Sequence, residues 1–390
     1  MEVIQLLEEQ YLEAIRLSEY AFQYKVPEDQ IEKRLQLFKK YHQIFGVLEE
    51  KELTAKLHLI PFEIFLGEEN CKMGGIAGVA TYPEFRRNGY VKKLLKHVLE
   101  TMRQDGYSVS MLHPFSVSFY RKYGWELFAN RLVWSLSKAD LIMKEHVSGS
   151  IKRFNKESHL KEIEIIYEQF AKRYSGMLVR NQGFWLDFVY GDLHAAVYYN
   201  QVDEPTGYML YKIESSKMKV EEFLPLNSEA RNGLWNFICQ HDSMIQELEM
   251  IVHEKEPLLF SLQEPRVKAE IKPYFMVRIV DVERFLKKYP FVWENNEEEL
   301  ILHISDSFAP WNNQTVLFGD KEIVMVNEEE AVAFKGKGVQ LNINALSTAL
   351  FGYKSPWELY QIGVISGMEK DIKQFENLIP FQQPFIYDFF

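Results

Sequence analysis

Two arginines, an asparagine and a glycine occupy residues 86–89, between an apolar run and a segment with helical periodicity. The first amides of a helix have no intrahelical partner and carry partial positive charge, so they can hold a phosphate group. Gly89 permits close approach or a positive φ, and Arg86 and Arg87 add charged donors. This arrangement predicts a cradle for a pyrophosphate, with an arginine-rich surface turn as the alternative. The segment has neither a P-loop pattern nor a GxGxxG fingerprint.

A tyrosine that could donate a proton, Tyr120, lies downstream in the stretch SVSFYRKYGW. A phenol has an ordinary pKa of ~10 and stays protonated at neutral pH, so it suits a departing thiolate of similar basicity. The alternative is an aromatic side chain packed behind a sheet, which is how we interpret Tyr123 and Trp125.

Candidates for a general base are His113, Glu84 and the end of the chain. A histidine at a strand end more often has a structural role. The final stretch PFIYDFF is too apolar for a frayed tail, and termini are ordered only when they are tied down. If Phe389 and Phe390 pack into a core, the α-carboxylate of Phe390 has a fixed position and an ordinary pKa of ~3.5. A hydrophobic anchor is the alternative.

A strand, a helix and a second strand are needed to position these groups. GIAGVATY (75–82) and SVSML (108–112) are short apolar runs that predict strands. Between them, apolar residues recur at helical spacing and form one stripe: Val91, Leu94, Leu95, Val98, Leu99 and Met102. A strand, a helix and a strand in this order predict a right-handed crossover and a parallel strand pair.

The remaining chain predicts a connection at 130–154, a second mixed block at 155–290 and a further change of pattern from there on. In the second block, the triplet Arg231-Asn232-Gly233 at a predicted helix start loosely repeats the triplet that begins at Arg87. Apolar helices are predicted within 343–366, and Ser355 is a plausible N-cap with Pro356 at the first helical position. The fold class is therefore mixed, α+β with α/β elements.

Composition and charge narrow the class of protein. The chain has 390 residues, 47% of them hydrophobic and 26% charged, which is typical of globular proteins with two or three domains. Its net charge of −11 opposes nucleic acid and anionic lipid and favours cationic ligands. The two cysteines, Cys71 and Cys239, predict no disulfide framework and no metal site. With neither a signal peptide nor an apolar run of ~18 residues, we expect a cytoplasmic protein without membrane insertion.

The stretch from residue 75 to residue 127 resembles the core of GCN5-related N-acetyltransferases (GNAT). Their motif Q/R-x-x-G-x-G/A binds the coenzyme A pyrophosphate; Arg86 and Gly89 match it, whereas Val91 departs from the last Gly or Ala. The pattern P-x-x-R-R-x-G at 83–89, followed by Y-x-x-F/Y-G-Y/W from Tyr120, is similar to the enhanced-intracellular-survival (Eis) type. The length, the second block and the final DFF also fit this type.

The resemblance implies a GNAT domain at 1–130, a GNAT-like domain without cofactor at 131–285 and a sterol-carrier-protein-like domain at 286–390. Ala230 stands where the first block has Arg86, so we expect no coenzyme A in the second domain. In the first domain, the resemblance implies that acetyl-CoA is held by Val79, Ala80, Thr81, Arg86, Arg87, Asn88, Gly89, Tyr90, Val91, Lys92, Phe115 and Ser116.

The resemblance also implies Tyr120 as general acid and the α-carboxylate of Phe390 as general base. It implies acetylation of amine-rich small molecules such as aminoglycosides, at several amino groups, or of protein lysines, by a homo-hexamer. Phe22, Tyr24 and Phe62 are expected near the mouth of the site. The alternatives are a carrier of lipid or another hydrophobic ligand, built on the apolar helices of 343–366, and a non-catalytic scaffold.

Overall fold

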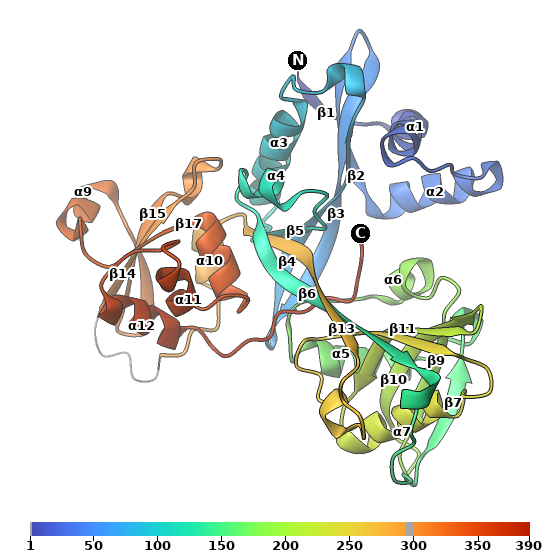
Figure 1. Ribbon diagram of the computed structural model, residues 1–390. Coiled ribbons are helices and arrows are strands. Elements are labelled where there is room, and N and C mark those ends of the chain that lie inside the picture. Colours follow the sequence, from blue (N-terminus) through green and yellow to red (C-terminus); the bar gives the residue numbers. More distant parts are fainter. Residues whose placement is uncertain (1, 294–298) are drawn as a thin grey trace.

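The computed structural model describes residues 2–293 and 299–390, which form three blocks (Figure 1). The N-terminal block contains β1 (Val3–Gln5), α1 (Tyr11–Phe22), α2 (Glu28–Tyr41), β2 (Gln43–Glu49), β3 (Glu52–Leu66), β4 (Glu69–Thr81), α3 (Tyr90–Gln104), β5 (Val109–Leu112) and α4 (Val117–Arg121).

The second block contains β6 (Glu126–Ser137), β7 (Ser150–Phe154), α5 (Lys161–Ala171), β8 (Ser175–Leu178), α6 (Gln182–Phe184), β9 (His194–Tyr199), β10 (Pro205–Glu214), β11 (Lys217–Pro225), α7 (Ser228–Cys239), β12 (Glu247–Val252) and β13 (Lys268–Ile279). The third block contains α8 (Val282–Leu286), β14 (Leu300–Ser305), β15 (Gln314–Gly319), β16 (Glu322–Val326), α9 (Glu328–Ala331), β17 (Val339–Asn342), α10 (Ile343–Leu350), α11 (Pro356–Gln361) and α12 (Glu369–Leu378).

One 13-stranded sheet runs through the first two blocks in the order β1-β2-β3-β4-β5-β13-β6-β12-β11-β10-β9-β7, with β8 paired to β3. β13 lies between β5 and β6 and pairs antiparallel with both. The first two blocks therefore share one sheet. The third block has its own sheet in the order β16-β15-β14-β17. None of the helices in the described ranges is long and apolar enough to cross a membrane.

The predicted strand, helix and parallel strand are confirmed as β4, α3 and β5. β4 and β5 are parallel, with Met73 opposite Val109 and Ile76 opposite Leu112. The apolar stripe of α3 is buried against one face of the sheet, as Leu94, Leu95, Val98, Leu99 and Met102 show. Helices α1 and α2 cover the opposite face (Figure 1). The site residues around β4 thus lie between two helical layers.

The interpretation of residues 130–154 as a connection is wrong, because β6 occupies the first part of that stretch and β7 begins at Ser150. In β6, Leu132, Trp134 and Leu136 are buried at every second position, which is the period of a half-buried strand. Polar residues at the middle of β6 interrupt the apolar run. One of them, Arg131, donates a hydrogen bond to the carbonyl of Tyr387 in the C-terminal segment. The prediction that the second block is mixed is confirmed, since it contains the helices α5 and α7 and the strands β9, β10, β11 and β12.

The cap predicted for α11 is confirmed. Ser355 accepts a hydrogen bond from the Glu358 amide, the Glu358 side chain returns to the Ser355 amide, and Pro356 is the first helical residue. The apolar helix α10 is buried along nearly its whole length. Its residues pack into the same core as β13 and β14, so core packing accounts for their apolar character.

Candidate active site

β4 has an open edge where it passes the end of β5. The parallel register stops at Ile76 and Leu112, whereas β4 continues to Thr81. On the other side, the pairing of β4 with β3 shifts between Ala77 and Ala80, which leaves Gly78 in a bulge with φ +55°. Residues 77–79 are partly exposed. On the β5 side, the backbone amides and carbonyls of residues 77–81 therefore have no partner in the ladder and can bind an extended ligand.

The turn between β4 and α3 has the conformation that the sequence predicts for a cradle. Gly89 has a φ of +79° and Arg87 a φ of +69°, so two residues of the turn are left-handed. α3 begins at Tyr90, and no side chain in the described part of the chain caps it. Its first amides are therefore free to bind an anion at the positive end of a 15-residue helix.

The predicted cradle residues divide into two groups. Arg86, Arg87, Asn88, Gly89 and Lys92 are exposed, and the Arg86 Nε donates to the Thr81 carbonyl at 3.4 Å. The side chain of Tyr90 is buried, and that of Val91 packs on the same core, so these two residues can offer only backbone groups. The side chain of Val91 therefore does not occupy the turn, although the sequence motif expects a smaller residue there.

Tyr120 lies on α4, on the α3 side of the sheet. Its ring contacts Phe115 and Phe119, with centroids at 5.5 Å and 5.2 Å. Ser116 caps the helix by accepting from the Phe119 amide. Burial raises the pKa of the Tyr120 phenol, so the group holds its proton at neutral pH. A protonated phenol is what a proton donor requires.

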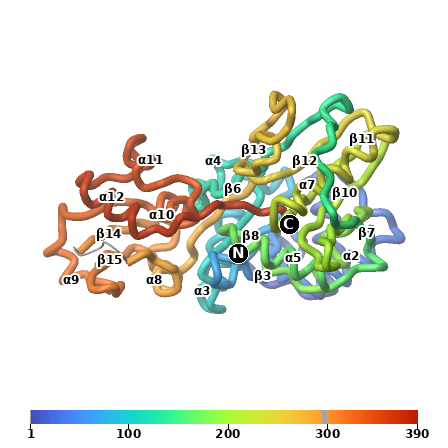
Figure 2. The backbone as a smooth tube through the Cα atoms, turned by 90° about the horizontal axis from the view of Figure 1, so that it is seen from below, coloured from blue at the N-terminus to red at the C-terminus, as the bar shows by residue number. Residues whose placement is uncertain are grey.

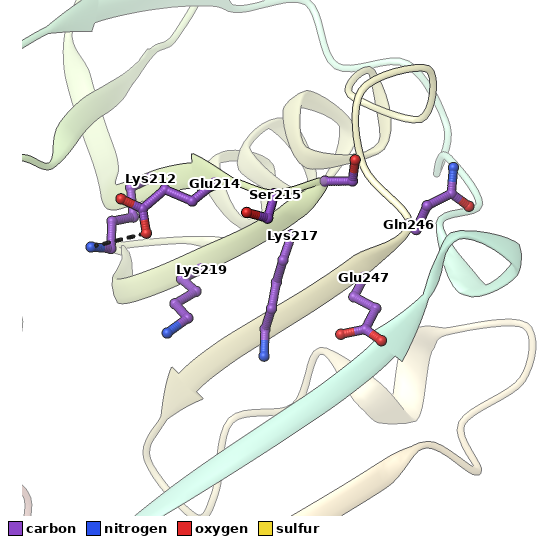
Figure 3. Close-up of a pocket in the computed structure, with 8 residues that line it drawn as sticks. Lys212, Glu214, Ser215, Lys217, Lys219, Gln246 and Glu247 are labelled. Atoms are coloured by element: carbon purple, nitrogen blue, oxygen red, sulfur yellow. Dashed lines mark ion pairs between the residues drawn. The ribbon is translucent and has the colours of Figure 1, made fainter.

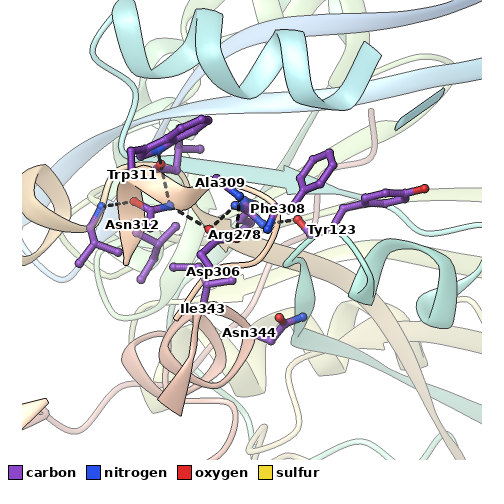
Figure 4. A network of polar contacts seen from close by, with 12 residues as sticks. Tyr123, Arg278, Asp306, Phe308, Ala309, Trp311, Asn312, Ile343 and Asn344 are labelled. Carbon is purple, nitrogen blue, oxygen red and sulfur yellow. Dashed lines mark hydrogen bonds and ion pairs between the residues drawn. The ribbon is translucent and has the colours of Figure 1, made fainter. Parts of the chain in front are cut away.

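The third block holds the C-terminal end of α4 (Figure 4). Arg278 of β13 donates to the Tyr123 carbonyl and forms an ion pair with Asp306. Burial lowers the pKa of Arg278 to about 10, and the Asp306 carboxylate offsets part of this, so the guanidinium stays charged. The Asn344 amide donates to the Arg121 carbonyl at 3.1 Å and to the Trp125 carbonyl at 3.0 Å.

The C-terminal segment runs from the third block to the middle of the molecule (Figure 2). A buried ion cluster holds it there: the Arg180 Nε donates to the Asp388 carboxylate at 2.9 Å, and Arg180 also pairs with Glu222. Burial raises the pKa of Asp388, and Arg180 opposes this shift. The Tyr274 hydroxyl donates to the Asp388 carbonyl at 2.9 Å. Residues of the second block thus fix the segment two residues before Phe390.

The Phe390 ring lies against β4. It packs on Phe62 and Phe275, with centroids at 4.8 Å and 4.9 Å. A Cβ at Gly75 would come within 2.7 Å of this ring. A Cβ at the preceding Gly74 would meet Met102 of α3, so Gly75 and Phe390 lie on the opposite face, which α1 and α2 cover. The structure therefore brings Phe62 and Phe390 together on one face of β4.

The other predicted residues near the mouth and the other candidate bases occupy different places. Phe22 is exposed at the end of α1, and Tyr24 contacts Arg34 at 5.3 Å rather than Phe62 or Phe390. Glu84 is exposed in the turn after β4. His113 packs on Phe389 with centroids at 5.1 Å, and burial lowers the pKa of its ring.

Three basic side chains beside the bulge were missed by the sequence analysis. Lys56 and His58 of β3 bond to each other, and His58 also bonds to His42. The available signal was a lysine and a histidine two positions apart in an apolar strand, which places both on one face. The two buried ion clusters of Arg180 and Arg278 carried no such local signal, because their partners lie far away in sequence.

The repeated triplet of the second block lies in a different position from its counterpart. α7 begins at Ser228 with Asn227 as its cap, so Arg231, Asn232 and Gly233 lie inside the helix and not before it. Arg231 pairs with Glu256. Gly233 is enclosed, since a Cβ there would meet the Tyr198 ring at 2.2 Å. The triplet in α7 is therefore not equivalent to the turn before α3. The order strand, helix, parallel strand is nevertheless repeated by β11, α7 and β12.

Two surface pockets lie away from these residues. One surrounds the β10–β11 turn, where Lys217 and Lys219 stand beside Glu247 and an ion pair joins Lys212 to Glu214 (Figure 3). The other, in the third block, is lined by polar and small residues, among them His303, Thr315, Glu328, Lys335 and Gln340. Neither pocket contains a predicted site residue.

Comparison with known protein families matches three segments of the chain. Residues 2–128 match an acetyltransferase (GNAT) domain family, residues 176–279 match a second acetyltransferase (GNAT) domain family, and residues 282–387 match a sterol carrier protein domain family. No curated protein sequence matches the chain.

Solved structures similar to the whole chain come from several bacteria. A protein of Enterococcus faecalis, described as a conserved protein of unknown function and probable N-acyltransferase, is 26% identical with a TM-score of 0.91, covering 100% of this chain and 99% of that one. A GCN5-related N-acetyltransferase of Anabaena variabilis is 20% identical with a TM-score of 0.85 and full coverage of both chains. Eis1 of Mycobacterium abscessus is 16% identical with a TM-score of 0.80, again over both whole chains.

Proposed function

The chain carries two acetyltransferase (GNAT) domains and a sterol carrier protein domain and is an N-acetyltransferase, and from this premise we propose that its N-terminal domain transfers acetyl groups from acetyl-CoA to amine-rich small molecules. The observation that carries the proposal is the open edge of β4 at 77–81, which leads directly into the uncapped start of α3 behind Gly89. The extended arm of acetyl-CoA needs an open strand edge, and its pyrophosphate needs a free helix start directly beside that edge. The domain limits 1–130, 131–285 and 286–390 remain a prediction.

The residues of this chain fit an acyl-CoA at that edge. Backbone groups of Val79, Ala80 and Thr81 would hold the arm, and the amides from Arg87 through Lys92 would hold the pyrophosphate, with the side chain of Arg86 beside them. Phe115 and Ser116, which flank the end of β5, would border the same ligand. Bound acetyl-CoA supplies an acetyl thioester.

Acid and base would act from opposite faces of β4. Tyr120, protonated and on the α3 side, gives its proton to the leaving sulfur. On the other face, the α-carboxylate of Phe390, where Phe390 ends the chain, takes a proton from the attacking amine. The buried cluster of Arg180, Glu222 and Asp388 supports this role because it holds the preceding residues in one position.

The proposed acceptors are aminoglycosides, acetylated at several amino groups, with protein lysines as further candidates. The resemblance of residues 83–125 to the Eis type and the net charge of −11 support a polycationic acceptor. By the same resemblance to the Eis type, we propose a homo-hexamer that acts in the cytoplasm. Light scattering coupled to size exclusion measures the assembly directly; a monomer would refute the hexamer without affecting the proposed chemistry.

A thiol-release assay with acetyl-CoA and a panel of aminoglycosides and polyamines tests the activity. We expect turnover with polyamino acceptors and saturable acetyl-CoA binding by calorimetry. Arg87→Ala should weaken acetyl-CoA binding, whereas Arg266→Ala, at an exposed arginine paired with nearby Glu264, is the matched control and should not. Absence of both turnover and acetyl-CoA binding would overturn the proposal.

Deletion of Phe390 tests the proposed base. We expect kcat to fall by about 10²-fold or more, in the range of general acid–base catalysis, with acetyl-CoA affinity retained. Phe390→Leu is the control, since it changes the ring and keeps a terminal carboxylate at the same position. Full activity of the deletion variant in a folded protein would show that the carboxylate is not the base.

A further inference from the structure

Three nitrogen bases form a hydrogen-bonded row on the α2 side of the sheet. The Lys56 Nζ lies 2.7 Å from the His58 Nε2, and the His58 Nδ1 lies 2.9 Å from the Nδ1 of His42. Lys56 is fully buried and His58 nearly so, whereas His42, at the end of α2, is partly exposed. The Phe38 ring of α2 covers both imidazoles. The row thus leads from the interior to the surface.

The row consists of bases alone. Within the described ranges, no carboxylate bonds to any of the three, and the charged side chain that acts on them from α2 is Arg34. Burial lowers the pKa of Lys56 to about 7 and that of His42 to about 4, and the Arg34 charge adds to both shifts. Burial lowers the pKa of His58 as well. Both imidazoles are therefore neutral at pH 7, and Lys56 exchanges its proton near that pH.

Neutral imidazoles in a row can pass protons in sequence. Each has one nitrogen that donates and one that accepts, and a change of tautomer reverses the two roles. The nitrogens that bond in this row are the Nε2 and Nδ1 of His58, so a proton accepted on one side of that ring can leave from the other. A structural role alone accounts poorly for the row, because basic groups that are buried without a compensating carboxylate destabilise the fold relative to apolar residues.

The inner end of the row meets the bulge of β4. A Cβ at Gly78 would lie 3.0 Å from both the Lys56 Nζ and the His58 Cδ2. Gly78 is followed by Val79, at the edge where the thioester would be held, and residues 77–79 are partly exposed. The missing side chain at Gly78 therefore lets the inner end of the row approach the backbone of β4 at the bulge.

Acetyl transfer to an ammonium group must release one proton. A C–N bond forms and the C–S bond breaks; the nitrogen gives up two protons to become a neutral amide, and the sulfur takes up one. The second proton has to pass from the base to solvent. A row of bases that begins at the bulge of β4 and ends at the surface offers such a path on the acceptor side of the strand.

We propose that Lys56, His58 and His42 form a proton relay that carries the proton released by each transfer from the β4 bulge to solvent at His42. The relay rests on the proposed acetyltransferase function and adds a path that Tyr120 and Phe390 do not supply. Protons pass from Lys56 to His58 and from His58 to His42, and the row returns to its neutral state when His42 loses its proton to water or buffer.

Kinetics of His42→Ala and Lys56→Met test the relay. We expect kcat to fall by about tenfold or more with KM for acetyl-CoA unchanged, because proton transfer and not binding is affected. Added imidazole should restore kcat of His42→Ala in a concentration-dependent way, which a merely structural role would not produce. His303→Ala is the matched control, since His303 is a partly buried histidine of the third block, bonded to Thr315, and should leave kcat unchanged.

The outcomes separate the relay from the function on which it rests. A wild type without turnover overturns the proposed function and the relay's role with it. An active wild type whose folded His42→Ala and Lys56→Met variants keep full kcat overturns the relay alone. Nitrogen NMR of labelled histidine gives a readout that needs no turnover: we expect neutral His42 and His58 at pH 7, and an imidazolium at either position overturns the relay.

Discussion

At Gly75 and Gly78, the missing side chains of β4 let other parts of the chain approach the strand. The Phe390 ring occupies the space at Gly75, and Lys56 with His58 occupies the space at Gly78. The cradle glycine, Gly89, was predictable because its neighbours carry charge and a helix follows. The row of Lys56, His58 and His42 beside Gly78 was not predictable. The alternation of a strand indicates which of its own side chains share a face, but it does not indicate that His42, from the end of α2, contacts them there.

Removal of one oxygen atom tests the role of Tyr120. Tyr120→Phe should lower kcat by about 10²-fold to 10⁴-fold, because the leaving sulfur loses its proton donor. The Kd of acetyl-CoA should stay near the wild-type value, since the ring still packs on Phe115 and Phe119. Thiol release measures the first quantity and calorimetry the second. Tyr123→Phe, at a neighbouring tyrosine, is the control; an unchanged kcat in Tyr120→Phe would refute the acid role.

The buried Lys56 predicts a pH-dependent stability that needs no assay of activity. Its pKa is about 7 in the folded protein against an ordinary 10.5, so between these values the unfolded chain binds more protons. The contribution of Lys56 to the free energy of unfolding of the wild type therefore becomes more favourable as pH increases from about 7 towards 10.5. Arg34, His58 and His42 are the charged or titratable groups around it.

Lys56→Met removes this contribution. We expect the Tm of the variant relative to wild type to be higher at about pH 6 than at about pH 9.5, because the buried charge penalises only the wild type and only at the lower pH. Thermal unfolding followed by circular dichroism in both buffers gives the difference. A difference in Tm that is the same at both pH values would mean that Lys56 stays charged in the folded protein throughout this range and would refute the lowered pKa.

At the scale of elements, β4, α3 and β5 were predictable because each has a regular apolar pattern and a clear end. The strand that the sequence analysis missed, β6, has the alternation Leu132, Trp134, Leu136, but Arg131 and its polar neighbour interrupt the run. The Arg131 side chain donates to the Tyr387 carbonyl and lies over the Tyr274 ring. A contact with the far end of the chain thus obscured a local signal.

The turn before α3 offers a matched pair of glycines. Gly89 and Gly191 both have positive φ, +79° and +52°, and a Cβ at either would meet no heavy atom of the described residues within 4 Å. Gly89→Ala and Gly191→Ala should each lower stability by about 1–2 kcal/mol through backbone strain. Only Gly89→Ala should also raise the Kd of acetyl-CoA, by about tenfold, because its strain reorients the amides that hold the pyrophosphate. Equal affinities in calorimetry would place the cradle elsewhere.

At the scale of the whole molecule, the site is assembled from all three blocks. The first supplies β4 and α4, the second holds the terminal segment through Arg180, and the third holds the end of α4 through Asp306 and Asn344. The sequence resemblance predicted three domains, yet it could not predict these contacts, because each joins residues that local patterns treat separately. A contact between residues more than 150 positions apart in the chain, such as that between Arg180 and Asp388, produces no periodic pattern in the sequence.

Coupling between the third block and α4 is testable at Asn344. Asn344→Ala removes both hydrogen bonds to the end of α4, so it should lower stability by about 1–3 kcal/mol and kcat severalfold, since Tyr120 is less well held. Asn327→Ala is the control: it removes the cap of α9 in the same block, costs about 1 kcal/mol and does not touch α4. Denaturant unfolding and thiol release measure the two effects, and equal losses of kcat would argue against a specific coupling.

Because a ribosome makes β5 long before β13, the first acetyltransferase domain cannot close its sheet while it is being synthesised. Until residue 268 and those after it emerge, the edge of β5 that later pairs with β13 is a bare row of amides and carbonyls. N-terminal domains usually fold first during translation, but here the first domain has to wait for the last strand of the second. The nascent chain therefore passes through a long stage in which that edge can pair with another chain, and this stage is where we expect aggregation to compete with folding.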